Sequence, residues 1–94
     1  MNLLQEIEKQ LESYTFKAGT WIGYPSIKDD SVYFNAKGRD LDVAKAFRDC
    51  FGGTAIAGSV KTISKHIKRK EGGYTIGYSV SEIETMIQEI KEVA

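Results

Sequence analysis

The residues best suited to chemistry with a charged partner are five cations that fall within one ten-residue stretch. This stretch contains no acid, and its cations are Lys61, Lys65, Lys68, Arg69 and Lys70. Lysine and arginine neutralise phosphates, while the neighbouring Thr62 and His66 can reach base edges or backbone oxygens. Tyr74 follows shortly afterwards and offers a ring that can stack on a base. These eight residues together predict a nucleic-acid-binding surface, to which Lys37 and Arg39 would add charge.

A single element must position these side chains, and the spacing of apolar residues favours a helix. Val60, Ile63 and Ile67 recur at helical intervals, so one face of a helix would pack on the body while the polar residues point outward. A strand over residues 60–69 is the alternative. It would put Ile63 and Ile67 on the same face as lysines and so mix polarity. We therefore expect a basic helix over residues 59–70.

The same stretch resembles the second helix of a helix-turn-helix, and more narrowly the modular DNA-binding motif found beside some intron-encoded nucleases. In that motif a recognition helix of the type Ser-x-x-x-Ile-Ser-x-x-Ile runs into Gly-Gly-Tyr-x-Trp-x-Tyr. The corresponding residues here are Ser59, Ile63, Ser64, Ile67, Gly72, Gly73, Tyr74, Ile76 and Tyr78, with isoleucine in place of the tryptophan. The resemblance implies that the helix around Lys61 to Arg69 contacts DNA, so DNA is favoured over RNA as the partner.

Residue types that carry metal-binding or catalytic chemistry are scarce in this sequence. Cys50 and His66 are its only cysteine and histidine, whereas a structural zinc site usually takes four such ligands. Cys50 also lies beside Phe47 and Phe51 at the end of an expected helix, a setting typical of a buried structural thiol. The sequence therefore predicts a binding protein that is not an enzyme and that holds no metal or cofactor.

Aromatic residues between positions 14 and 36 form a second candidate surface. Trp21, Tyr24, Tyr33 and Phe34 fall in runs of β-formers, and aromatic residues on a small sheet usually belong to its core. If one sheet face is left uncovered, they would instead make a protein-binding patch. The alternative function is accordingly a protein-binding module or a small inhibitor of the kind mobile elements encode. It would use this aromatic hairpin or the acidic terminal helices, and its partner would be another protein or a second copy of the chain.

The remaining patterns predict one small α+β domain spanning residues 1–94. The expected order is α-β-β-α-α-β-α, with a short antiparallel sheet packed on helices. Besides residues 59–70, helices are expected at residues 2–13, 41–51 and 80–93, and strands at residues 19–27, 31–36 and 74–78. Gly52-Gly53 would end the second helix and a loop of small residues, 53–58, would follow.

Local signals refine these boundaries. Asn2 with Gln5 and Ser79 with Glu82 have the spacing of capping boxes. Asp40 is expected to be the N-cap of the second helix. Pro25, the only proline, predicts an edge strand or a bulge in the hairpin.

Composition bounds the class of protein. The apolar share of 41% and the charged share of 28% are ordinary for a globular domain. No apolar run approaches the roughly 18 residues that span a bilayer, and the start of the chain lacks the basic region of a signal peptide. With a single cysteine, these features predict a cytoplasmic protein without a membrane partner. The net charge is zero, but the clustered cations and the glutamates of residues 81–94 predict one basic and one acidic face.

Overall fold

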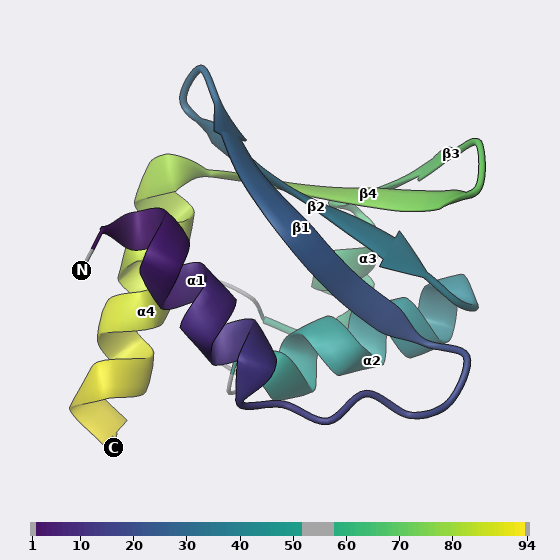
Figure 1. Cartoon of the computed structure of the whole chain (residues 1–94), viewed down its shortest axis with the longest axis horizontal. Coiled ribbons are helices and arrows are strands. Elements are labelled where there is room, and N and C mark those ends of the chain that lie inside the picture. The colour runs from purple at the N-terminus through teal and green to yellow at the C-terminus, as the bar shows by residue number, and fades with distance from the viewer. Residues whose placement is uncertain (1, 52–57, 94) are drawn as a thin grey trace.

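The computed structural model describes residues 2–51 and 58–93, which form a four-stranded antiparallel sheet packed on four helices (Figure 1). The elements in chain order are α1 (Leu3–Glu12), β1 (Trp21–Lys28), β2 (Ser31–Lys37), α2 (Asp40–Cys50), α3 (Val60–Ser64), β3 (Ile67–Lys70), β4 (Gly73–Ser79) and α4 (Val80–Val93). The strands lie in the order β1-β2-β4-β3, and each neighbouring pair is antiparallel. The α+β class is therefore confirmed, and β3 is a further strand between α3 and β4.

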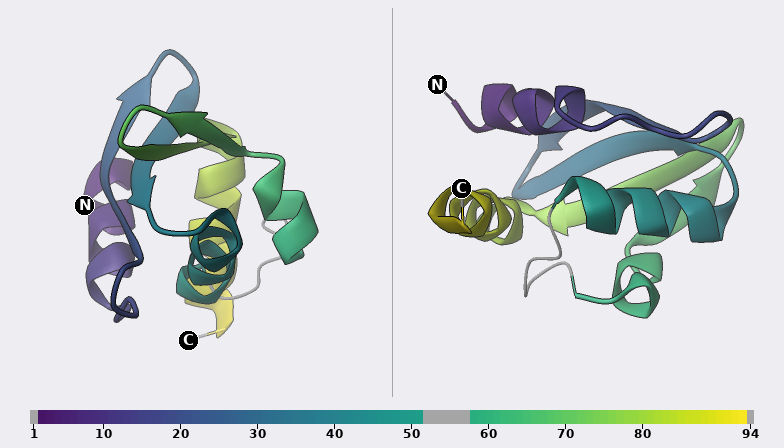
Figure 2. Two further views of the ribbon diagram at one scale, coloured as in Figure 1. Left: turned by 90° about the vertical axis from the view of Figure 1, so that its right-hand side faces the viewer. Right: turned by 90° about the horizontal axis from the view of Figure 1, so that it is seen from below.

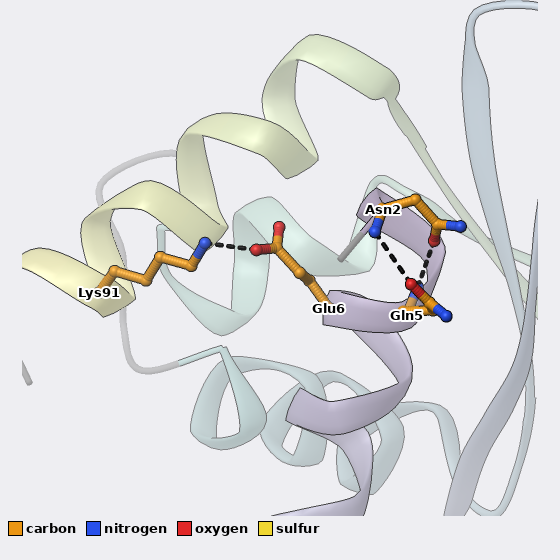
Figure 3. Close-up of polar contacts among 4 residues, drawn as sticks. All are labelled: Asn2, Gln5, Glu6 and Lys91. Carbon is orange, nitrogen blue, oxygen red and sulfur yellow. Dashed lines mark hydrogen bonds and ion pairs between the residues drawn. The ribbon is translucent and has the colours of Figure 1, made fainter.

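Helix α1 begins where the sequence predicts, at a capping box (Figure 3). The side chain of Asn2 accepts a hydrogen bond of 2.9 Å from the Gln5 amide, and the side chain of Gln5 accepts one of 3.0 Å from the Asn2 amide. Both bonds satisfy amide groups that have no partner inside the helix. Farther along α1, Glu6 forms an ion pair with Lys91 of α4, which links the two terminal helices (Figure 3).

The β1–β2 hairpin has a two-residue turn and an irregular edge strand. Lys28 pairs with Ser31 across the turn, where Asp29 has a φ of 56°. The register shifts between Gly23 and Ser26, at the position of the proline. β1 forms one edge of the sheet, so the prediction of an edge strand or bulge is confirmed on both counts. Proline is tolerated there because the ladder does not need its missing amide hydrogen.

Helix α2 supplies the centre of the core. Phe47 is fully buried, and its ring lies 5.6 Å from that of Phe34, 4.6 Å from that of Phe51 and 5.2 Å from that of Tyr78. The helix starts one residue earlier than predicted. Arg39 occupies the N-cap, since its carbonyl accepts a hydrogen bond of 2.9 Å from the Val43 amide, and the Asp40 carboxylate accepts one of 2.9 Å from the amide of the next residue, Leu41.

Residues 59–70 do not form the single basic helix that the spacing predicts. Helix α3 ends at Ser64, and Ile67–Lys70 pair with β4 as strand β3. A tight turn at Glu71-Gly72 connects β3 directly to β4. Gly72 adopts a φ of 83° there, which glycine tolerates without strain. Pairing supplies hydrogen-bond partners to β4, and Ile67 lies opposite the buried Ile76. The position of Ile67 in the sequence therefore suits a strand as well as a helix.

Helix α4 also agrees with the sequence at its start. The Glu82 amide donates to Ser79 Oγ at 3.1 Å, and the Ser79 amide donates to Glu82 Oε1 at 3.0 Å. The expected helix end at Gly52-Gly53 and most of the loop of small residues that follows lie outside the described residues. Within the described ranges, no helix is both long and apolar enough to cross a membrane.

Candidate nucleic-acid interface

The sheet has two chemically different faces because successive side chains of a strand alternate between them. Val32, Phe34 and Ala36 of β2 are buried in the core, so Tyr33 and Asn35 point to the opposite side. Figures 1 and 2 show that α2, α3 and α4 lie on one side of the sheet, while α1 runs alongside edge strand β1. We call the side opposite the core the outer face.

The outer face is basic. The cross-strand register places Lys28 opposite Ser31, Lys37 opposite Trp21, Lys68 opposite Thr75 and Lys70 opposite Gly73, and all four lysines are exposed. Aspartate and glutamate are absent from all four strands. Helices α1 and α4 instead carry seven of the 13 acids of the chain. The neutral total thus conceals a charge separation between sheet and helices.

Aromatic rings lie on the same face, each beside a glycine. A Cβ atom on Gly77 would come within 3.2 Å of the Tyr33 ring, and one on Gly23 would collide with the Trp21 ring at 2.3 Å. Both rings therefore lie flat over the backbone of the sheet. Tyr33 remains 39% exposed, and Tyr24, at the bulge, is 75% exposed and meets Trp21 edge to face. Such rings are accessible to a planar ligand.

Two hollows of the outer face combine aromatic rings with lysines, while a further hollow beside edge strand β1 is lined by Trp21 and Tyr24 together with Glu8 and Glu12 of α1. We call the first the hairpin hollow. It has a volume of 510 Å³ and is lined by Trp21, Tyr24, Asn35, Ala36, Lys37 and Lys70. We call the second the β4 cavity. It has a volume of 320 Å³ and lies where β4 extends beyond β3, with Tyr33, Lys65, His66, Lys68 and Glu82 among its lining residues.

His66 is fixed beside the β4 cavity by three interactions. Its carbonyl accepts a hydrogen bond of 3.1 Å from the Gly77 amide, and its Nδ1 lies 2.8 Å from the Gly77 carbonyl oxygen. Because a carbonyl only accepts, Nδ1 carries the hydrogen and Nε2 is the nitrogen left for another partner. The imidazole also stacks on the Tyr78 ring at 3.9 Å, and Tyr78 in turn stacks on Phe47. The stack connects the cavity wall to the core.

The eight residues predicted from the sequence divide between different parts of the structure. Lys65, His66 and Lys68 come together at the β4 cavity, and Lys70 lies farther along the outer face, where it contacts Asn35. Lys61 and Thr62 lie on α3, and Thr62 helps to form the cap with Ser59.

Arg69 and Tyr74 point to the other side of the sheet edge, opposite each other in the register, with the guanidinium carbon 6.0 Å from the ring centroid. A hydrogen bond to Tyr74 raises the pKa of Arg69. These two residues therefore do not share a surface with Lys68 and Lys70.

Several outer-face residues were outside the predicted nucleic-acid site. Trp21, Tyr24 and Tyr33 were expected in the core or in a protein-binding patch, and of the four aromatic residues considered there only Phe34 is fully buried. The alternation of apolar and polar residues over 32–36 is the signal that identifies the outward-facing Tyr33 and Asn35.

The remaining chemistry-bearing groups of the described residues form no second site. Cys50 is buried, as the sequence predicts, and burial raises its pKa to about 12, so it remains a thiol at neutral pH. Over residues 2–51 and 58–93, no three histidine, cysteine or acidic side chains gather in a way that could hold a metal ion.

Comparisons with known proteins do not assign the chain to a family. No protein-family model, curated protein or solved structure matches the chain.

Proposed function

We propose that this domain binds nucleic acid, in single-stranded form, through the outer face of its sheet. The observation that carries the proposal is the combination of exposed lysines and accessible aromatic rings on a face without acidic strand residues. A basic helix is not part of this proposal, because Lys68, Arg69 and Lys70 belong to strand β3 and Lys65 is the C-cap of α3.

The charges match the backbone of a nucleic acid. Lysines neutralise phosphates and release bound counterions, which gives an affinity that falls as salt concentration rises. Lys37 and Lys70 border the hairpin hollow, while Lys65 and Lys68 border the β4 cavity. A strand crossing the outer face would meet positive charge at both ends of its path.

The aromatic rings favour an unpaired strand over a duplex. Bases in a duplex are stacked on one another, whereas those of a single strand are free to stack on protein side chains. Tyr33 and Trp21 lie flat on the sheet, and Tyr24 is exposed beside them. Every base has a flat face, so this mode of contact tolerates different sequences. Asn35 and Thr75, which pair across β2 and β4, could add hydrogen bonds between the two hollows.

The test is fluorescence anisotropy of labelled single-stranded DNA, single-stranded RNA and duplex DNA at low and physiological salt. Lys68→Ala with Lys70→Ala is the test variant. Lys9→Ala with Lys45→Ala is the control, since it removes the same charge from exposed positions on α1 and α2. We expect salt-sensitive binding of single strands that the first pair weakens and the second leaves close to wild type. Equal effects of the two pairs would contradict binding by the outer face, and the absence of binding at low salt would contradict the function.

Protein binding is the second candidate function, and one observation favours it. Tyr24 is a large side chain left 75% exposed, and it is braced by Trp21. Exposed aromatic residues of this kind often anchor protein interfaces. The Tyr24→Ala variant separates the two functions. It should weaken nucleic-acid binding by no more than the stacking of one base, because Tyr33 and the lysines remain, and it should abolish association if a protein or a second copy docks on the hairpin.

A further inference from the structure

The β4 cavity exists because two neighbouring strands differ in length. β3 pairs with β4 only from Gly73 to Ile76, so the last residues of β4 continue past the end of β3. The backbone of His66 pairs with Gly77 at this point, and the start of α4 closes the far end with Ser79 and Glu82. The result is a recess of 320 Å³, near the lower end of the range for small-molecule pockets.

One wall of the cavity is flat and aromatic. Tyr33 leans over Gly77, and the absence of a side chain at that position allows the ring to lie against the strand. A planar ligand can stack on such a ring without specific hydrogen bonds.

The opposite side of the cavity is charged. Lys65, at the C-terminal cap of α3, and Lys68, on the outer face of β3, both line it and are exposed. Two lysines at one recess suit an anionic group such as a phosphate. His66 adds the free Nε2 of its imidazole to the same region, because Nδ1 is held by the Gly77 carbonyl.

A carboxylate completes the lining. Glu82 accepts hydrogen bonds from Ser79 through Oε1, and the bond from the Ser79 backbone amide lowers the pKa of Glu82, so the group is ionised at neutral pH. A carboxylate accepts hydrogen bonds from the amino groups of bases. It can therefore accept from the exocyclic amino group of adenine, cytosine or guanine, whereas uracil and thymine lack that group and offer only the ring imino N–H.

Tyr78 forms the wall of the cavity on its core side, between His66 and Phe47. Tyr78 lines the cavity, and its hydroxyl is buried without a hydrogen-bond partner among the described residues. The oxygen is inaccessible to solvent, so Tyr78 lends the cavity a rigid wall and no hydrogen bond to a ligand.

We propose that the β4 cavity holds a single unpaired nucleotide bearing an amino-substituted base, with the base on Tyr33 and the phosphate between Lys65 and Lys68. This inference rests on the proposed function, since the nucleotide would be one unit of a bound strand. It also makes a separate claim, namely that a free nucleoside monophosphate binds there.

The test is titration of the protein with AMP, CMP, GMP and UMP, followed by amide chemical shifts and by calorimetry. Inorganic phosphate and cytidine serve as partial probes. Lys65→Ala is paired with Lys61→Ala, an exposed lysine of the same segment that does not line the cavity. Tyr33→Ala is paired with Tyr33→Phe, which keeps the ring. Circular dichroism of every variant shows whether it is folded.

We expect shifts at Tyr33, His66 and Gly77, and tighter binding of AMP, CMP or GMP than of UMP. Loss of one charge-assisted contact in Lys65→Ala should weaken binding about tenfold, while Lys61→Ala should bind as wild type. Tyr33→Phe keeps the ring and should retain most of the affinity that Tyr33→Ala loses. Mononucleotide binding without strand binding would support a nucleotide site in the β4 cavity and contradict the proposed function. Strand binding with no mononucleotide shifts at the cavity would overturn the cavity inference alone. Absence of both would overturn both.

Discussion

Tyr33 of β2 and Gly77 of β4 lie directly opposite each other on the outer face, and the tyrosine ring covers the glycine. An added Cβ atom at residue 77 would stand 3.2 Å from Cε1 of the ring. The pairing holds a large aromatic ring flat on the sheet while leaving it 39% exposed. This relationship gives the outer face a flat and accessible stacking surface.

Removal of the Tyr33 ring should weaken binding of single strands while the fold is kept. Stacking of one base on an aromatic side chain contributes about 1–3 kcal/mol, so Tyr33→Ala should lose that amount of binding free energy. Tyr33→Phe keeps the ring and should bind almost as wild type. Anisotropy with a short labelled oligonucleotide measures both. Equal affinity of the alanine variant and wild type would show that no base stacks on this residue.

Gly77→Ala should disturb the same contact without removing the ring. The new methyl group would push the ring away by a few tenths of an ångström, so binding should weaken in the direction of Tyr33→Ala but by less. The backbone φ of Gly77 is not in the left-handed region, so alanine adds no backbone strain. Denaturant unfolding and anisotropy on the same sample separate an effect on the fold from one on binding.

The dependence of affinity on salt should report the number of lysines that meet phosphates. For a single strand, the slope of log affinity against log salt changes by about 0.7 for each phosphate neutralised. If Lys68 and Lys70 each meet one phosphate, changing both to alanine should reduce the slope by about 1.4. Lys9→Ala with Lys45→Ala should leave the slope unchanged. A slope that is the same in all three proteins would exclude β3 from the interface.

Stability should decline in alkaline solution. Burial raises the pKa of Tyr78 from 10.0 to about 12 and that of Cys50 from 9.0 to about 12. Both groups therefore ionise more readily in the unfolded chain than in the folded one. Their contribution to stability is present below pH 9 and is lost as the pH rises from about 9 towards 12. Each group that ionises only in the unfolded chain lowers the free energy of unfolding by up to roughly 1.4 kcal/mol for every step of one in pH.

Urea unfolding at a series of pH values from 7 to about 11 measures this loss of stability. Tyr78→Phe should reduce the dependence on pH above 10, and it should cost little stability at pH 7 because the hydroxyl has no partner among the described residues. Tyr24→Phe removes a phenol that is 75% exposed and serves as the matched control. If the free energy of unfolding of Tyr78→Phe falls with pH in parallel with that of wild type, Tyr78 does not contribute to the alkaline loss of stability.

The stacked rings of the core should dominate the stability of the fold. Phe47 is fully buried and contacts the rings of Phe34, Phe51 and Tyr78. Phe47→Ala should therefore destabilise the domain by about 3–5 kcal/mol. Leu41→Ala, on the same helix but 53% exposed, should change stability by less than about 0.5 kcal/mol. Chemical denaturation of the two variants provides the comparison.

The sequence by itself determined the elements whose signals are local. Capping boxes at Asn2 and Ser79 marked the starts of α1 and α4, because the partner groups lie three residues apart in the chain. Pro25 indicated an edge strand or a bulge, since a proline lacks the amide hydrogen that an interior strand donates, and the structure shows both. These features depend on neighbours in the chain and need no knowledge of the fold.

The tertiary structure alone decided where the cations lie. Ile63 and Ile67 are four residues apart, a spacing that suits a helix and that is also even, as a strand requires. The choice was made by β4, which offers residues 67–70 a hydrogen-bonded partner, so the helix ends at Ser64. That pairing turned Lys68 and Lys70 towards the outer face, away from Arg69 and Tyr74. It also placed Lys68 and Tyr33 in the lining of one cavity, a proximity that follows from strand pairing between distant segments and not from local sequence.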